Sequence, residues 1–377
     1  MKKYFYIYIF FGILFLICGG NYLLSDIQTL NIENKATKLT RPTINESNEE
    51  VPNYRIIPYY VKKCKTFFKK YEEFYNDNFI LKGIFVKLYN NLKWSMATNP
   101  NPKQIIVGED NWLFLGNFYD NINETILGID TFSTQELKLM EEVQLERKRF
   151  LDSLGIDYYI MIAPEKSTIY AEKFPIKLNV DRTKTDQTKE LLTRLGITVI
   201  FPKEALLEKK NSLQLYYKYD SHWNGNGAYI GYSQLMDSLK IKHPELQKLS
   251  ISDFHISTEY KNIENDLSNI LFIESDWDNI PEYGLKNPTT QLLERRFDQN
   301  NPKIRVLSTI GNTKKLISLN DSYLPIFATY LGESFKEYAM YQFVGFPNFH
   351  YDVILKERPD IVVFEIVERS IFALCHK

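Results

Sequence analysis

The chain has 377 residues, enough for one large domain or two ordinary ones with a core that needs no disulfide or metal to hold it. A formal net charge of -1 offers no basic surface for a phosphate backbone, which argues against nucleic-acid binding. The five histidines and three cysteines show no structural-zinc spacing, so we expect no bound metal and no cofactor.

The N-terminus carries an uncharged apolar run, Tyr4–Leu24, behind Lys2 and Lys3. About 20 apolar residues span a bilayer, and no small-residue cleavage site follows the run as it would in a secretory signal. The positive-inside rule keeps the two lysines in the cytoplasm. We therefore expect residues 1–24 to be a single-pass anchor in the inner (cytoplasmic) membrane, with the rest of the chain on the periplasmic, extracytoplasmic side.

Two segments of different character follow the anchor. Residues 25–57 are polar and typical of a linker that buries little apolar surface. Residues 58–99 are rich in Lys, Tyr and Phe, and their apolar residues recur at three- and four-residue spacings, which predicts a helical lead-in of one or two amphipathic helices. The segment 105–117 then predicts a strand, a tight turn and a second strand.

Capped helices alternate with apolar strands in the remaining chain. Ser133 and Glu136 form a capping box that opens a helix ending near Gly155, and a second helix is predicted from about 183 to 195. Further apolar runs predict strands at residues 158–163, 197–201, 314–319 and 360–367.

This alternation predicts an α/β fold in which helices cover both faces of a mostly parallel sheet. We expect a three-layer α/β/α domain over residues 100–377. Residues 240–310 are polar and break the alternation, which predicts an insertion.

Polar residues follow three of the predicted strands. Lys166 comes after the strand at 158–163, Asp220 and His222 come after the strand-like run at 213–217, and Ser322 follows the next predicted strand. The carboxyl ends of parallel strands lie at one edge of a sheet, where functional groups gather. We therefore expect the three clusters to lie near one another.

Asp220 and His222 have the residue types of a general base and its orienting partner. An imidazole titrates near neutral pH, and a carboxylate fixes its tautomer and stabilises its protonated form. Two residues apart on an extended loop, both side chains can point to the same side. An ordinary surface loop or a helix cap would leave the same short pattern, and triads are identified by geometry rather than by such patterns.

Ser322 supplies a nucleophile between an apolar strand and a predicted helix. The backbone N–H groups at that helix start can stabilise an oxyanion. Ser322 or Asp321 could equally serve only as a helix cap. A metal site formed by Asp220, His222 and Asp266 is a competing arrangement, although no second histidine stands at ligand spacing.

Six segments, in chain order, carry a resemblance to a known family. They are VGEDNWLFLGN, APEKSTIYAEKFP, YDSHWNGNGAY, NDLSNIL, LNDSYLPIFATYLGESF and RPDIVVFEIVERSI. Together they resemble the alginate O-acetyltransferases of the SGNH-hydrolase-like superfamily, and most of all the membrane-anchored branch with its D-x-H-W signature. The resemblance covers roughly residues 100–375.

The resemblance implies an acetyl-enzyme on Ser322, with His222 as the base and Asp220 as the orienting carboxylate. The acetyl group would pass to a hydroxyl of an exported polysaccharide. One departure is Asn320, which stands where the family has glycine before Asp-Ser. Further residues expected to contact substrate or the oxyanion are Asn320, Asp321, Lys166 and Trp223.

The resemblance also implies a multi-spanning membrane acyltransferase as the acetyl supplier. Two other functions fit the same residues. One is a carbohydrate O-acetyl esterase, because it would use the same Ser-His-Asp arrangement with water as acceptor. The other is a non-catalytic polysaccharide-binding component of an export complex.

Overall fold

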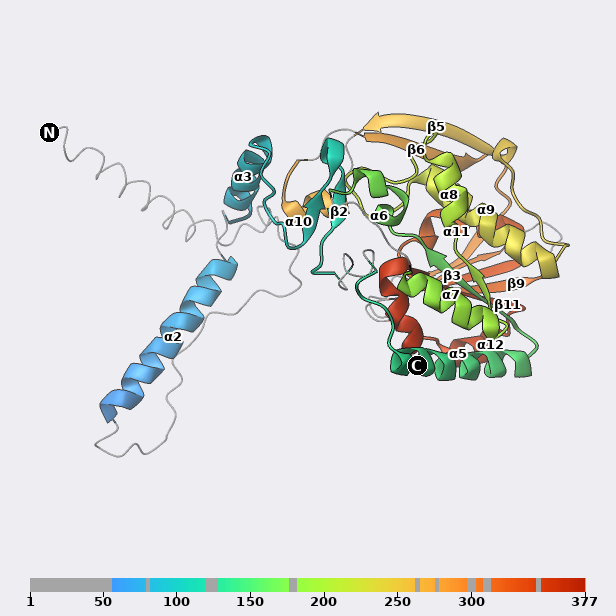
Figure 1. Ribbon diagram of the computed structural model, residues 1–377, viewed down its shortest axis with the longest axis horizontal. Coiled ribbons are helices and arrows are strands. Elements are labelled where there is room, and N and C mark those ends of the chain that lie inside the picture. The colour runs from blue at the N-terminus through green and yellow to red at the C-terminus, as the bar shows by residue number, and fades with distance from the viewer. Residues whose placement is uncertain are drawn as a thin grey trace. The chain divides into compact units, whose positions relative to one another are not determined.

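The computed structural model describes residues 56–78, 82–119, 122, 128–175, 182–261, 265–274, 278–296, 303–307, 313–343 and 347–376. The chain divides into two compact units, residues 1–98 and residues 99–377 (Figure 1). The predicted anchor at 1–24 and the predicted linker as far as residue 55 lie outside the described residues. Among the helices that are described, none has the length and apolar character needed to cross a membrane.

The first unit contains two helices, α2 (Ile56–Asn78) and α3 (Lys82–Ser95). They confirm the predicted helices of this region. Aromatic side chains are frequent along α2, where the ring centroids of Phe67 and Tyr71 lie 6.0 Å apart.

The second unit begins with the predicted hairpin of β1 (Ile105–Val107) and β2 (Leu113–Leu115). The two predicted helices follow as α5 (Thr134–Ser153) and α7 (Lys184–Arg194). Each starts at a reciprocal capping box, Ser133 with Glu136 and Thr183 with Asp186, which satisfies backbone N–H groups that a helix start leaves unpaired.

A seven-stranded sheet with the order β4-β3-β11-β9-β10-β8-β7 forms the centre of this unit. Its parallel part contains β3 (Asp157–Ala163), β4 (Thr198–Ile200), β9 (Lys315–Asn320), β10 (Glu337–Gln342) and β11 (Ile361–Val367). An antiparallel extension contains β7 (Gln291–Arg296) and β8 (Lys303–Leu307). The predicted α/β fold with a mostly parallel sheet is confirmed.

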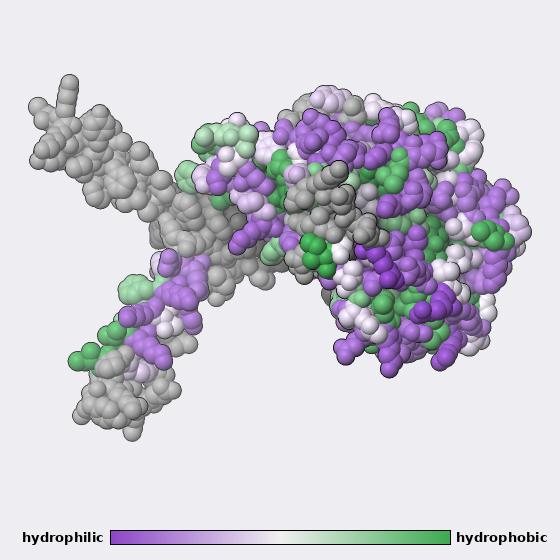
Figure 2. All heavy atoms as spheres, in the orientation of Figure 1, coloured by the Kyte–Doolittle hydropathy of each residue, from purple (hydrophilic) through white to green (hydrophobic). Residues whose placement is uncertain are grey.

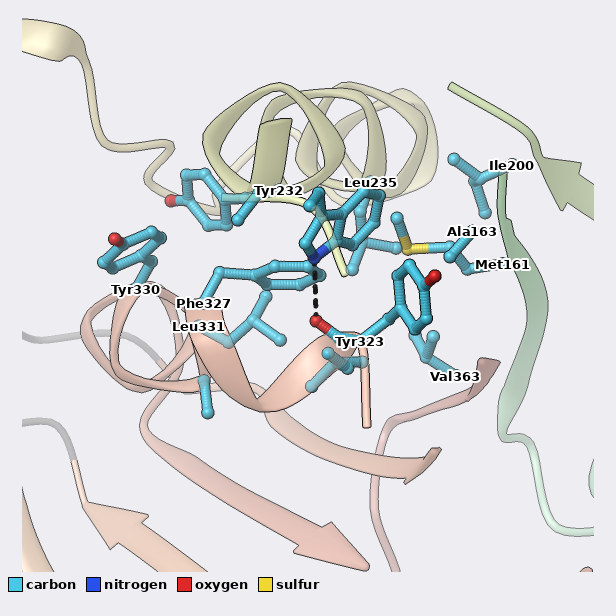
Figure 3. Close-up of a cluster of buried hydrophobic side chains, with 14 of the residues drawn as sticks. Met161, Ala163, Ile200, Tyr232, Leu235, Tyr323, Phe327, Tyr330, Leu331 and Val363 are labelled. Atoms are coloured by element: carbon cyan, nitrogen blue, oxygen red, sulfur yellow. Dashed lines mark hydrogen bonds between the residues drawn. The ribbon is translucent and has the colours of Figure 1, made fainter. Parts of the chain in front are cut away.

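Successive side chains of β3 pack on opposite faces of the sheet, as a pleated strand requires. Met161 and Ala163 belong to a core shared with α9 (Gly225–Lys242) and α11 (Ala328–Ser334) (Figure 3). Ile160 and Ile162 belong to a second core shared with α5 and α7.

The outer surface that Figure 2 shows for this unit is mainly hydrophilic, with scattered apolar side chains. Further described elements are α6 (Lys166–Ile169), α8 (Lys203–Lys209), α12 (Tyr351–Glu357) and the 3-10 helices Glu109–Asn111, Ala171–Lys173, Ile251–Asp253, Leu324–Phe327 and Glu368–Cys375.

One prediction about an element is wrong. The run at 213–217 forms no sheet strand and pairs only through an isolated bridge between Tyr216 and Trp223. The predicted insertion at 240–310 contributes β7 and β8 to one edge of the central sheet. It also contains α10 (Asp266–Leu271) between the paired strands β5 (Phe254–Lys261) and β6 (Asp278–Leu285).

Candidate active site

Ser322, His222 and Asp220 are joined by two hydrogen-bonding contacts, and His222 takes part in both. Ser322 follows strand β9, separated from it by Asp321. Asp220 and His222 lie on the loop between α8 and α9. His222 Nε2 is 2.7 Å from Ser322 Oγ, and His222 Nδ1 is 2.7 Å from Asp220 Oδ1. Ser322 is exposed and the two loop residues are half-buried, so a substrate can reach the hydroxyl.

The Asp220 carboxylate is held on both oxygens. Its Oδ1 also accepts a hydrogen bond from the backbone N–H of His222 at 2.9 Å, and its Oδ2 accepts one from the N–H of Asp266 at 2.9 Å. Burial alone would raise the pKa of Asp220, but the hydrogen bond and charge of His222 outweigh burial and lower that pKa to about 2. The carboxylate therefore stays ionised at neutral pH.

The His222 imidazole has a pKa raised above its ordinary value. Burial acts to lower this pKa, but the hydrogen bond to Asp220 and the negative charges of Asp220 and Asp266 prevail. The ring also lies against Tyr323, with centroids 4.7 Å apart. A base of this kind accepts a proton from a hydroxyl and keeps it long enough to return it.

Asp266 is part of this site in a way that sequence reasoning missed. Its Oδ1 accepts the backbone N–H of Ser221 at 2.7 Å, and its Oδ2 accepts the Ser221 hydroxyl and lies 3.7 Å from His222 Nδ1. Burial, followed by the charge of Asp220, raises the pKa of Asp266. The NDLSNIL segment carried a signal for this residue, because it stands among the segments with family resemblance, although nothing in it indicated a contact with Ser221.

The competing metal arrangement has its residues together, since ligand atoms of Asp220, His222 and Asp266 lie within 4.8 Å of one another. The two ring nitrogens of His222 are already bonded, Nδ1 to Asp220 and Nε2 to Ser322. Among the described residues, this group contains one histidine and two carboxylates.

Trp223 connects the loop that carries His222 to the turn that carries Ser322. Its indole Nε1 donates to the carbonyl oxygen of Tyr323 at 3.0 Å, the bond drawn as a dashed line in Figure 3. The hydroxyl of Tyr323 in turn donates to the carbonyl oxygen of Ser221 at 2.7 Å. The Trp223 side chain is fully buried, so it does not meet the expectation of a substrate contact. Its bond to Tyr323 fixes the position of Ser322 relative to His222.

Asn320 and Asp321 also bind protein groups rather than facing outward. Asn320 is buried, donates to the Asp321 carbonyl oxygen at 2.8 Å and accepts the Ser318 hydroxyl at 2.7 Å. The Asp321 carboxylate accepts the N–H groups of Tyr323 at 2.8 Å and Val367 at 2.6 Å. These side chains shape the turn that carries the serine, and their expected contact with substrate or oxyanion stays a prediction. Asn320 is not among the residues of positive φ, so this position does not require glycine.

Lys166 is likewise buried, and its ammonium points at the backbone of the loop. Nζ donates to the carbonyl oxygens of Tyr217 at 3.1 Å, Lys218 at 3.2 Å and Asp220 at 2.7 Å. The expectation that Lys166 contacts substrate is not met, because only 2% of this residue is exposed.

Comparison with known families gives one match over more than half of the chain. A sequence profile of the family described as "SGNH hydrolase-like domain, acetyltransferase AlgX" matches residues 105–319. The matched range includes Asp220 and His222 and ends before Ser322. A comparison with curated proteins gave no significant match.

Solved structures with a similar fold include three of low sequence identity. PatB1 of Bacillus cereus has a TM-score of 0.54 and 16% identity, over 72% of this chain and 98% of that one. A DHHW family protein of Eubacterium siraeum has a TM-score of 0.50 and 14% identity, over 71% and 90%. The O-acetyltransferase domain of Pseudomonas putida AlgJ has a TM-score of 0.48 and 17% identity, over 71% and 92%. The first two show that the central fold is shared.

Proposed function

We propose, from the premise that this chain belongs to the SGNH hydrolase-like acetyltransferase family of AlgX, that it is an O-acetyltransferase acting on hydroxyls of an exported polysaccharide. The family membership supports acyl transfer. The observation that carries the proposal is the continuous contact from Ser322 Oγ to His222 Nε2 and from His222 Nδ1 to Asp220, at 2.7 Å each.

In the proposed reaction, Ser322 Oγ attacks the acetyl carbonyl carbon of the donor while His222 Nε2 takes its proton. The donor's leaving group departs with that proton, and an acetyl ester remains on Ser322. A sugar hydroxyl then attacks the ester carbonyl, gives its proton to His222, and leaves as the acetylated sugar. The proton returns to Ser322 Oγ. Asp220 stays ionised throughout and stabilises the imidazolium.

We further propose that residues 1–24 anchor the enzyme in the inner membrane, with the site on the periplasmic side. The uncharged run Tyr4–Leu24 behind two lysines supports this orientation. A multi-spanning membrane acyltransferase would then deliver the acetyl group from the cytoplasm. Protease added to intact spheroplasts tests the orientation, because it should remove the body of the chain only if that body lies outside.

Ser322→Ala tests the reaction in cells. We expect the variant to accumulate normally while acetylation of the exported polysaccharide is lost, because the nucleophile is absent. Ser212→Ala is the matched control, since its hydroxyl is exposed and donates to the carbonyl oxygen of Lys209. Normal acetylation in the Ser322 variant would refute the proposed reaction.

Purified protein separates the transferase from the two other functions. An activated acetyl ester is supplied with and without an oligosaccharide, and a serine-reactive phosphonate is used as a label. A transferase should turn over faster with the sugar and yield acetylated sugar. Turnover to free acetate that the sugar does not change would indicate an esterase. A folded protein that neither turns over nor reacts at Ser322 would indicate the non-catalytic function.

A further inference from the structure

We propose that Lys166 is a positioning residue of this site, whose ammonium group gathers three carbonyl oxygens of the segment 217–220 and so sets where Asp220 and His222 stand. The proposal rests on the proposed function, because it concerns the rate at which Ser322 is activated. It assigns to Lys166 neither contact with substrate nor transfer of a proton.

The contacts of Lys166 match the bonding capacity of an ammonium group. Nζ carries three N–H donors when protonated, and it meets three acceptors, the carbonyl oxygens of Tyr217, Lys218 and Asp220, at 2.7 to 3.2 Å. All three acceptors come from four consecutive residues. Carbonyl groups normally point to alternate sides of an extended chain, so turning three of them toward one point curves the backbone.

Other hydrogen bonds also hold the curved segment, since the N–H of Leu113 donates to the carbonyl oxygen of Lys218 at 3.1 Å and the N–H of Ser268 donates to that of Tyr219 at 3.3 Å. Tyr216 pairs with Trp223 in an isolated bridge, and the N–H of Tyr217 donates to the carbonyl oxygen of His222 at 3.3 Å. Asp220 lies at the end of the curve: its carbonyl oxygen is bound by Lys166 while its carboxylate binds the His222 ring. A displacement of the carbonyl would therefore move the carboxylate and imidazole away from Ser322.

The surroundings of Lys166 make its charge state sensitive to pH. Nζ lies 5.6 Å from the ring centroid of Trp112 and 5.2 Å from that of Phe114. Burial lowers the pKa of Lys166 to about 7, against the opposing effect of four carboxylates. These carboxylates belong to Asp266, Asp220, Asp278 and Glu165. Above this pKa a neutral amine has two N–H donors for three carbonyl oxygens, so one of the three loses its hydrogen bond from Lys166.

Lys166→Met in the full chain tests the proposal, with Lys210→Met as the matched control. Lys210 also donates from a partly buried Nζ to a backbone carbonyl, that of Ile169 at 2.7 Å, and it lies 5.8 Å from the ring of Tyr170. The readout is the rate at which a serine-reactive phosphonate labels Ser322 in protein that thermal unfolding shows to be folded. We expect a loss of about 100-fold for Lys166→Met, the scale for a misplaced catalytic group, and no change for Lys210→Met.

A pH profile of the wild-type protein gives a second measurement that needs no destabilising variant. We expect labelling to pass through a maximum and to fall as pH rises beyond about 7, because the neutral amine releases one carbonyl. Lys166→Arg keeps a cation, so any labelling it retains should lack this alkaline decline.

The outcomes separate the two proposals. Equal labelling of the two methionine variants, or a wild-type rate that stays constant up to high pH, overturns the role of Lys166 while leaving Ser322 as nucleophile. Labelling that persists in Ser322→Ala, or a wild-type protein that is never labelled, overturns the proposed function instead.

Discussion

At the scale of single residues, two carboxylates share one imidazole. Asp220 bonds His222 Nδ1 directly at 2.7 Å, and Asp266 Oδ2 lies 3.7 Å from the same nitrogen. Arg369 acts in the opposite direction, because its positive charge lowers the pKa of His222. The net result is a raised pKa, so the neutral base that the proposed reaction requires forms at a higher pH than it would for an ordinary histidine.

Asp266→Asn is predicted to move the acid limb of the pH–rate profile to lower pH. Removing a negative charge near the ring disfavours the imidazolium, so the pKa of His222 falls and the neutral base persists to lower pH. A shift of roughly one unit is the scale for a charge at this distance. The measurement is the labelling rate of Ser322 between pH 5 and pH 8, spanning roughly the range of the imidazole.

The matched control is Asp237→Asn, because that exposed carboxylate pairs with Lys248 at 2.7 Å. It should leave the acid limb where it is. An unchanged limb in the Asp266 variant would mean that this carboxylate serves only to hold Ser221.

The sequence indicated which residues meet but not which of them are buried. Asp220, His222 and Ser322 were predicted together because each follows an apolar run, and they do lie together. Burial of Lys166, Trp223 and their neighbours was not predictable, because it depends on contacts between segments such as the indole bond from Trp223 to Tyr323. A polar residue after a strand can face substrate or brace the backbone, and only the tertiary packing decides.

At the scale of elements, the helix starts were the best predicted features. Ser133 with Glu136 marks the start of α5 within one residue, because a capping box is a local interaction. The apolar run at 213–217 was predicted to be a strand. Its residues Leu215 and Tyr216 are instead buried by core packing, and the run as a whole pairs with no sheet. β7 and β8 were not predicted from the sequence, because strands at an antiparallel edge lack the long apolar run by which the buried strands were identified.

Gly227→Ala is predicted to destabilise the fold through the start of α9. A Cβ at this position would overlap the backbone carbonyl oxygen of Leu215 and lie 2.8 Å from Cβ of Trp223. Overpacking of this kind costs about 1–3 kcal/mol or more, whereas alanine gains at most about 1 kcal/mol in helix propensity. The overlap prevails because a backbone carbonyl cannot turn aside as a flexible side chain would.

The check is the free energy of unfolding from urea titration, with Gly284→Ala as control. A Cβ on Gly284 would have its nearest neighbour, the carbonyl oxygen of His255, at 3.8 Å, an ordinary contact. The control should be as stable as the wild type or slightly more so. Equal stability of the two variants would show that the chain around Leu215 can yield.

At the scale of the whole molecule, the second unit contains everything that the proposed reaction needs. Both hydrophobic cores are built from residues within 99–377, on the two faces of one sheet. Ser322, His222 and Asp220 belong to the same unit, as do Lys166 and Asp266, which bond the backbone of the loop that carries His222. Among the described residues, α2 and α3 add no side chain to either core.

Residues 99–377 expressed alone are therefore predicted to fold and to react. A chain of this length buries enough surface for independent stability, and no described side chain of residues 1–98 belongs to either core. We expect one cooperative urea transition and phosphonate labelling of Ser322 at the rate of the full chain, with Ser322→Ala in the same fragment as the control for labelling at that serine. A fragment that folds but labels slowly would mean that the first unit completes the site. An unfolded fragment would mean that the second unit depends on residues 1–98 for its stability.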